Sequence, residues 1–307
     1  MRVLVAGATG VIGRRLVPLL KEVGHEPVAL TRNPDRARDM LGVEAVVADA
    51  LVREDVLKGV GEAAPDAVVN LLTAIPAQLD VSRLAEEFVT TNLLRTRGTR
   101  NLLDAAPDAR HIAESVAFVY QPGDGLADED APTWHDGTPD QFATTLAAAL
   151  ELEEQLVAAG GLALRFGHLY GPGSGYAADG ATTAGIKAGH LPLIGGGHGW
   201  FSFIHSADAA TAIVAGLDRD VRGVLNVVDD HPVQAREWIP ETARMLGAPE
   251  PSVVTEEQGL AAVGEWGVAF LNRLRAVDNA RARTSLDWRP RYASWRDGFA
   301  AELQPGA

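Results

Sequence analysis

The 307-residue sequence contains no cysteine, which excludes disulfide bonds, thiolate nucleophiles and metal sites built on cysteine. Basic residues are also scarce, 27 against 41 acidic ones, and the net charge of −14 predicts neither nucleic acid nor an anionic membrane as a partner. No apolar run approaches the roughly 20 residues that span a bilayer, and no metal site is indicated. A short strand and a glycine turn follow Met1 directly, which is unlike a signal peptide, so we expect a cytoplasmic protein.

Short apolar runs alternate with helical patterns through the first half of the chain. The runs predict strands at 2–6, 27–31, 45–48, 67–72, 110–119 and 162–166. The periodic segments between them predict helices at 11–23, 35–41, 55–60, 84–106 and 141–159. This alternation with short connections predicts an α/β fold, a doubly wound parallel sheet with helices on both faces.

A glycine-rich turn joins the first predicted strand to the first helix. It reads Gly7-Ala8-Thr9-Gly10-Val11-Ile12-Gly13. In this context the first glycine permits a tight turn, the second lets backbone approach a pyrophosphate, and the third permits close packing of helix on strand. The free N–H groups of the helix start favour a phosphate. We therefore predict a Rossmann domain that binds a nicotinamide dinucleotide.

The composition of the sequence changes after residue 167, where glycine-rich segments separate short predicted helices and strands. We predict a Rossmann domain over 1–167, to which 200–228 returns. Residues 168–199 and 229–307 are predicted to form a small C-terminal substrate lobe.

The end of the second strand indicates which dinucleotide is bound. An NAD site usually has an acidic residue there for the ribose 2′-OH, but this sequence has Arg32, which suits a 2′-phosphate. We expect NADP(H), with NAD(H) as the alternative and a surface role for Arg32 left open. Asp49, after the third strand, either accepts a hydrogen bond from the adenine or forms a turn.

Four further motifs accompany the glycine turn: Asn92 in its helix, the segment Arg165–Gly173, the segment Phe203–Asp208 and the strand Val224–Asp229. Together they resemble the extended short-chain dehydrogenases/reductases of the NAD-dependent epimerase/dehydratase group. The resemblance covers nearly the whole chain. It also implies that Leu71, Asn92 and Val116 lie at the cofactor, and it implies a homodimer through long helices such as 84–106 and 141–159.

The sequence departs from this family at the catalytic residues. The family's Tyr and Lys, four residues apart, should open the helix before the sixth strand, but residues 142–154 contain neither. The family's Ser/Thr position falls on Val116, with Ser115 one residue earlier, and a one-residue step reverses the side-chain direction on a strand. Either another acid serves, or the substrate needs none, or the protein binds its cofactor without redox chemistry.

Few side chains remain as substitutes. His168 and Tyr120, both at carboxyl ends of strands, are candidate proton donors beside Ser115, although each also suits a structural role. Tyr170, Tyr176 and Trp200 are candidates for the substrate pocket. We predict an NADP(H)-dependent oxidoreductase for a small carbonyl, imine or enone. The alternatives are a redox-neutral epimerase, dehydratase or cyclase, and a non-catalytic NADP sensor.

Overall fold

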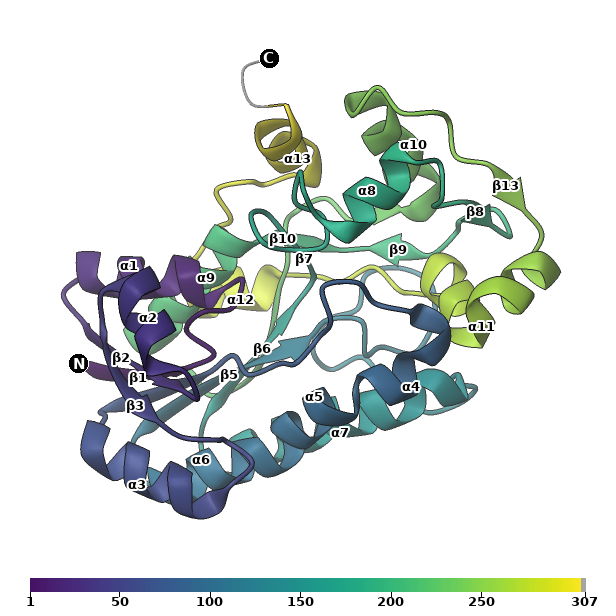
Figure 1. Ribbon diagram of the computed structural model, residues 1–307. Helices are drawn as coiled ribbons and strands as arrows, with labels where there is room; N and C mark the ends of the chain where they lie inside the picture. The colour runs from purple at the N-terminus through teal and green to yellow at the C-terminus, as the bar shows by residue number, and fades with distance from the viewer. Residues whose placement is uncertain (305–307) are drawn as a thin grey trace.

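A parallel sheet forms the centre of the protein in the computed structural model, which describes residues 1–304 (Figure 1). Its seven strands lie in the order β11-β6-β5-β4-β1-β2-β3. Their bounds are Gly223–Val227, Leu162–Phe166, Arg110–Val116, Ala67–Asn70, Arg2–Ala6, Glu26–Thr31 and Glu44–Val47. Strands β1, β4 and β6 are mostly apolar and buried, which is the pattern of a sheet covered by helices on both sides. The predicted doubly wound α/β fold is confirmed.

Helices cover both faces of this sheet (Figure 1). One face carries α1 (Gly13–Glu22), α2 (Pro34–Leu41), α9 (Ser206–Leu217) and α12 (Ala280–Ser285). The other face carries α3 (Arg53–Ala63), α6 (Thr99–Ala105) and α7 (Asp140–Ala158). Strand order reverses between β4 and β1, so the carboxyl end of β1 opens onto the crevice where such sheets bind ligands.

The segment predicted as one helix over 84–106 is interrupted. A 3-10 turn, η1 (Val81–Arg83), leads into α4 (Leu84–Glu87) and α5 (Val89–Leu93), and a π-helical turn, η2 (Leu94–Gly98), connects these to α6. A π-helical turn holds one more residue than an α-helical turn, so it changes the direction in which the following side chains project. This turn contains Arg95, which becomes buried between the helix layer and the sheet.

A second, smaller lobe lies beyond the carboxyl edge of the sheet (Figure 1). Its helices are α8 (Ala181–Lys187), α10 (Ala235–Met245), α11 (Glu256–Asn272) and α13 (Trp295–Leu303). Its short strands pair as β7 (His168–Tyr170) with β10 (Phe203–His205), β9 (Trp200–Phe201) with β12 (Val233–Gln234), and β8 (Leu193–Ile194) with β13 (Val253–Val254).

Residues 206–227 return to the Rossmann unit as α9 and β11, whereas residues 200–205 pair within the small ladders. A cluster of buried aromatic rings, including Phe201, Phe203, Trp238 and Trp295, holds the lobe together. Between residues 1 and 304, none of the helices has the length and apolar character needed to cross a membrane.

Candidate functional site

The glycine turn between β1 and α1 is shaped by close backbone contacts. Gly7 has φ 89°, and a Cβ atom there would lie 2.5 Å from the carbonyl oxygen of Leu71. A Cβ atom on Gly13 would lie 2.4 Å from the carbonyl oxygen of Ala8. Only glycine fits these positions, because the turn is packed against the end of β4 and against itself. Gly10 is exposed, so the middle of the turn stays open.

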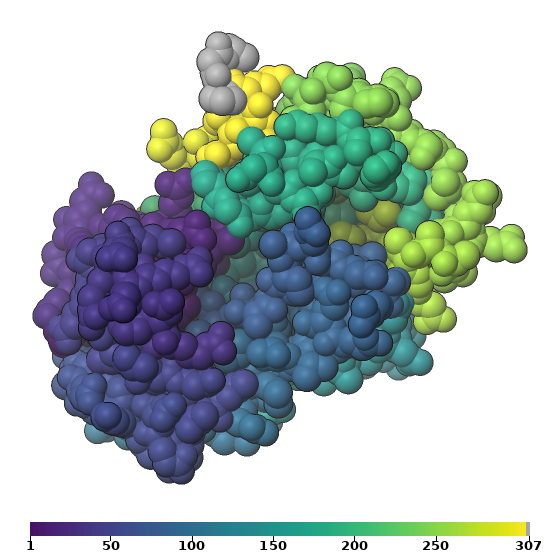
Figure 2. Space-filling view, viewed as in Figure 1, coloured from purple at the N-terminus to yellow at the C-terminus, as the bar shows by residue number. Residues whose placement is uncertain are grey.

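A cavity of about 250 Å³ opens above this turn. It contains seven of the predicted cofactor residues, namely Gly7, Ala8, Thr9, Gly10, Arg32, Asp49 and Leu71. Figure 2 shows the surface hollowed between the N-terminal unit and the segment near residue 80. Since the glycines leave a space that any Cβ would fill, beside a helix start, the residues present fit a dinucleotide.

The other predicted cofactor residues do not line this cavity. Val11, Ile12 and Gly13 belong to the turn, and Ile12 and Gly13 are buried behind it. Asn92 donates a hydrogen bond from Nδ2 to Oγ1 of Thr145 on α7, at 3.3 Å, and thereby links two helices. Val116 packs against an apolar cluster that includes Phe142 and Trp266. Their roles at the cofactor stay predictions.

Several lining residues were missed from the sequence. They are Leu30, Thr31, Ala48, Ala50, Leu51, Leu72, Thr73, Ala74, Thr90 and Leu94. Most follow directly from the rule that ligands meet the carboxyl ends of the strands, here β2, β3 and β4. Thr90 and Leu94 could not be found in this way, because they come from a helix that the fold brings over the cavity.

Arg32 and Asp49 lie on the rim of the cavity. Arg32 is exposed and makes no hydrogen bond or ion pair within residues 1–304, so its guanidinium is free to meet a ligand. The Oδ1 atom of Asp49 accepts a hydrogen bond from the backbone N–H of Leu51 at 2.9 Å. Asp49 therefore forms a turn and lines the cavity at once, and the two alternatives for this residue are compatible.

The start of α7 contains an apolar group where the family has its catalytic tyrosine. Phe142 is buried, and its ring stacks on Trp266 with centroids 3.8 Å apart and planes at 11°. One turn later, Thr145 is buried against Asn92, and Leu146 and Ala149 continue the buried face of the helix. None of these side chains donates or accepts a proton at neutral pH, so the residues at this end of α7 offer no general acid.

Ser115 and Tyr120 belong to a buried hydrogen-bond network that is centred on Glu153 and Arg165. Ser115 donates to Oε1 of Glu153 at 2.6 Å, and Arg165 binds both oxygens of that carboxylate, at 2.8 and 2.6 Å. Arg165 also donates to the hydroxyl of Tyr120 at 2.7 Å, and this hydroxyl donates to Asn226 at 2.6 Å.

The hydrogen bonds of this network join β5, β6 and α7, so its side chains have a structural role. Ser115 faces α7, as expected from the one-residue displacement of the serine. Burial raises the pKa of Tyr120, although Arg165 opposes this shift. The hydroxyl of Tyr120 is therefore protonated at neutral pH and committed to its neighbours. A catalytic role for Ser115 or Tyr120 stays a prediction without support from this geometry.

His168 is buried inside a group of aromatic rings. The rings of Phe201, Phe118, Phe270 and Phe203 lie between 4.3 and 5.6 Å from its own. Its Nδ1 atom lies 3.3 Å from the carbonyl oxygen of Ser202, and Nε2 has no partner within residues 1–304. Burial lowers the pKa of His168 to about 4, so the ring is neutral at physiological pH. A neutral imidazole is a weak acid, and this geometry does not support His168 as the donor.

The three predicted substrate residues occupy different environments. Tyr170 is buried, and a Cβ added to Gly298 would overlap its hydroxyl, so this ring packs inside the lobe. Tyr176 is partly buried, with edge-on contacts to Phe203 and Trp238. Trp200 is exposed. The structure does not bring the three side chains together, and their contact with a substrate stays a prediction.

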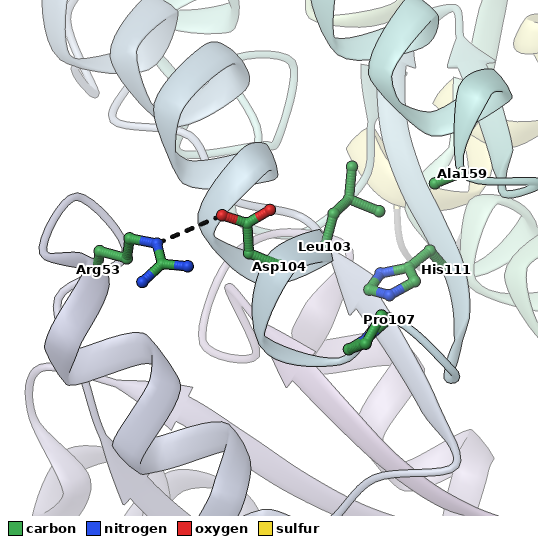
Figure 3. Close-up of a pocket in the computed structure, with 6 residues that line it drawn as sticks. All are labelled: Arg53, Leu103, Asp104, Pro107, His111 and Ala159. Atoms are coloured by element: carbon green, nitrogen blue, oxygen red, sulfur yellow. Dashed lines mark hydrogen bonds and ion pairs between the residues drawn. The ribbon is translucent and has the colours of Figure 1, made fainter.

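A second hollow, of about 460 Å³, lies away from the glycine turn. Figure 3 shows its lining, with Arg53 hydrogen-bonded to Asp104 at 3.3 Å and His111 beside Pro107. His111 is the second residue of β5, so this hollow is at the amino edge of the sheet. Ligands of open α/β sheets bind at the opposite edge. We therefore place the functional site at the cavity of the glycine turn.

The fold and cavity define a Rossmann-type dinucleotide-binding protein, and comparisons with known proteins agree. Residues 3–227 match the NAD dependent epimerase/dehydratase family. A Streptomyces protein named 3-diazoavenalumate denitrifying reductase is 46% identical over 309 residues, which cover 98% of this chain and 100% of that protein. The human epimerase family protein SDR39U1 is 29% identical over 270 residues, or 83% of this chain and 85% of that one.

Solved structures show the same fold. Human SDR39U1 (isoform 2) with NADPH has a TM-score of 0.72 at 22% identity, covering 99% of this chain and 100% of that chain. UDP-glucose 4-epimerase from Thermotoga maritima with UDP-glucose has a TM-score of 0.79 at 17% identity, covering 99% and 98%. The chain belongs to the NAD-dependent epimerase/dehydratase family, and it is an NAD(P)-dependent oxidoreductase. The predictions of family, fold and nicotinamide cofactor are confirmed.

Proposed function

We propose that this protein is an NADPH-dependent reductase that removes the diazo group of an aromatic or conjugated substrate as N2 and leaves hydrogen in its place. The observation that carries the proposal is the 46% identity to a named denitrifying reductase over nearly the whole of both chains. The expected substrates were a carbonyl, an imine or an enone, and a diazo compound belongs with these as an electrophile that accepts hydride.

The apolar start of α7 supports this chemistry. Bound NADPH supplies a hydride, and the protein's part is to bind, orient and exclude water. Hydride addition to an arene diazonium forms a C–H bond while the C–N bond breaks and its electron pair leaves with N2. No proton is needed in that case. A reaction centre with Phe142 in place of a phenol, and with a neutral His168, fits a substrate that carries its own leaving group.

The aromatic side chains near His168 support a flat substrate. Phe118 and Phe270 are both partly exposed, and their rings meet edge to face with centroids 6.4 Å apart. Aromatic rings in this arrangement offer faces and edges against which another ring packs favourably. Figure 2 shows a hollow between the segment near residue 80 and the yellow-green α11, the helix to which Phe270 belongs.

The test is turnover of a simple aryl diazo compound with NADPH that is deuterated at its transferable position. We expect one N2 released for each NADPH consumed, with deuterium at the carbon that carried the diazo group. N2 release without deuterium transfer would contradict the proposal. Consumption of NADPH with ketones, imines or enones alone would favour the carbonyl-type substrates, and conversion without net NADPH consumption would favour a redox-neutral enzyme. Tight NADPH binding with no turnover of any of these would favour a sensor.

Preference for NADPH is proposed from Arg32, whose guanidinium is free at the cavity rim. Replacing Arg32 by alanine is expected to weaken NADPH binding about 10- to 100-fold, since a charge-assisted hydrogen bond contributes about 1.5–3 kcal/mol. NADH binding should stay unchanged. Fluorescence titration of both nucleotides measures this, with Arg38→Ala as the control, because Arg38 on the neighbouring helix is exposed and pairs with Asp35. Equal losses for NADPH and NADH would show that Arg32 does not read the 2′-phosphate.

A further inference from the structure

Glu114 is a charged residue in the middle of a central strand of the sheet. Its neighbours Ala113 and Ser115 are buried, whereas Glu114 is partly exposed. Within residues 1–304 its carboxyl group makes no ion pair, and no hydrogen bond engages it. Alternation along a strand points Glu114 away from Ser115, and therefore away from the Glu153–Arg165 network. Its carboxyl group is left free to act.

The register of the sheet places Glu114 near the cofactor cavity. Ala113 pairs with Asn70, the last residue of β4, and Glu114 and Leu71 are the residues that directly follow this pair on the two chain segments. Leu71 lines the cavity, and its carbonyl oxygen is the atom that a Cβ on Gly7 would meet. Neighbouring strands are about 4.8 Å apart, so Glu114 lies about two strand spacings from the glycine turn. This is the carboxyl edge, where ligands bind.

Arg95 supplies a positive charge in the same part of the molecule. It is 4% exposed, and its guanidinium makes no hydrogen bond or ion pair within residues 1–304. Burial lowers the pKa of Arg95, and the charges of Glu114 and Glu153 oppose this shift, although Glu153 forms its ion pair with Arg165. Leu94, next to Arg95 in the π-helical turn, lines the cavity. A buried guanidinium without a partner is costly, which indicates that its charge has a use.

We propose that Glu114 is the proton donor of this enzyme and that Arg95 is a positioning residue that holds a positive charge beside the reaction centre. The inference rests on the proposed function. Hydride addition to a neutral diazo compound expels N2 with the C–N electron pair and leaves an organic anion. The proton of the Glu114 carboxyl group then passes to that anion, and Glu114 becomes a carboxylate. The charge of Arg95 stabilises both anions.

The charges around Glu114 determine its titration. Although Glu114 keeps some solvent exposure, the protein atoms packed around its carboxyl group raise its pKa to about 7, and the charge of Arg95 from η2 opposes this rise. Glu153 of α7 and Arg165 of β6 pair with each other. On the opposite face of the sheet, the charges of Arg15 on α1 and Asp208 on α9 affect the pKa of His205, but they are not among the causes of the shifted pKa of Glu114. Glu114 is therefore half protonated near neutral pH, and its acid form is lost as the pH rises above about 7.

The first experiment compares two substrates. With a neutral diazo compound, Glu114→Gln is expected to lower kcat about 100-fold, the lower end for loss of a general acid. With a cationic arene diazonium, which needs no proton, kcat should be unchanged, and NADPH affinity should be unchanged with both. Glu62→Gln, on the surface helix α3, is the matched control. Equal losses with both substrates, or no loss with the neutral one, would overturn the role of Glu114.

The second experiment does not require turnover. Infrared difference spectra of the protein, without nucleotide and with NADP⁺, report the carboxyl band that Glu114→Gln removes. We expect this band to titrate near pH 7. In Arg95→Gln it should titrate at higher pH, because the opposing charge is lost, and Arg95→Lys should restore the original value.

The two proposals fail in different ways. If the wild type turns over no diazo compound, the proposed function fails, while the infrared titration still tests the pair. A Glu114 band that titrates at the ordinary pH of a glutamate, or that Arg95→Gln does not move, would overturn the pair by itself.

Discussion

Replacing Glu153 by alanine is expected to lower the free energy of unfolding by about 3–5 kcal/mol, the range for removing one partner of a buried ion pair. Glu153 is buried on α7 and binds Arg165 through two hydrogen bonds. Burial by itself lowers the pKa of Arg165, but the bonds to Glu153 more than offset this, and the pKa is raised. Removing Glu153 takes this support away, but a guanidinium keeps its proton in proteins, so Arg165 stays charged in the variant without its counter-ion.

The loss extends beyond one pair because Glu153 also accepts the hydrogen bond of Ser115. Urea unfolding of the variant measures the change. The control is Glu151→Ala on the same helix, whose carboxylate pairs with Arg100 at 2.9 Å on the surface. Exposed pairs contribute about 0–1 kcal/mol. If the two variants lose the same stability, the network does not hold α7 on the sheet. The double variant Glu153→Ala/Arg165→Met should recover part of the loss, since it removes the unpaired charge.

Replacing Gly10 by valine is expected to weaken NADPH binding by about 100-fold or more, which corresponds to about 2.7 kcal/mol. Gly10 is exposed at the mouth of the turn, and its N–H donates to the carbonyl oxygen of Gly7 at 2.9 Å. A Cβ atom there would meet that oxygen at 3.2 Å and would otherwise face the cavity. The valine side chain therefore occupies space that the diphosphate needs, while the fold loses little.

Calorimetric titration with NADPH measures the affinity, and thermal unfolding without and with NADPH separates binding from folding. Ligand binding raises the unfolding temperature by mass action, and this rise should vanish in Gly10→Val. Gly61→Ala in α3 is the matched control, because a Cβ there has no neighbouring atom within 4 Å. Unchanged affinity in Gly10→Val would mean that the dinucleotide does not lie on this turn.

The sequence predicted the sheet because its strands are recognisable locally. Runs such as 2–6, 67–70 and 162–166 are apolar except for one polar residue each, and in a parallel sheet such runs have to be covered on both faces. The glycine turn could also be predicted from the sequence, since Gly7 and Gly13 occupy positions where the nearby backbone leaves no room for a Cβ atom. The absence of Tyr and Lys from α7 was also a property of sequence alone.

Other features depend on contacts between distant segments. The helix expected over 84–106 contains a π-helical turn, and no periodicity signals the extra residue that buries Arg95. Ser115 and Tyr120 were candidate catalysts by position, and only the packing of α7 on β5 and β6 shows them bound to Glu153 and Arg165. The homodimer expected through 84–106 and 141–159 stays a prediction.

The sequence by itself determined the fold class, the family and the nicotinamide dinucleotide, because these follow from local patterns of apolar residues and glycine. The tertiary structure decided which polar side chains are free. His168 and Tyr120 were candidates because they lie at the carboxyl ends of strands. In the structure His168 is a neutral ring in the core, and the hydroxyl of Tyr120 is hydrogen-bonded to Arg165. Glu114 on β5 and Arg95 in η2 come from successive parts of the chain with only α6 between them, and the side chains of both are left without hydrogen bonds. Solvation and pairing in three dimensions, which no local pattern encodes, set the charge and reactivity of each group.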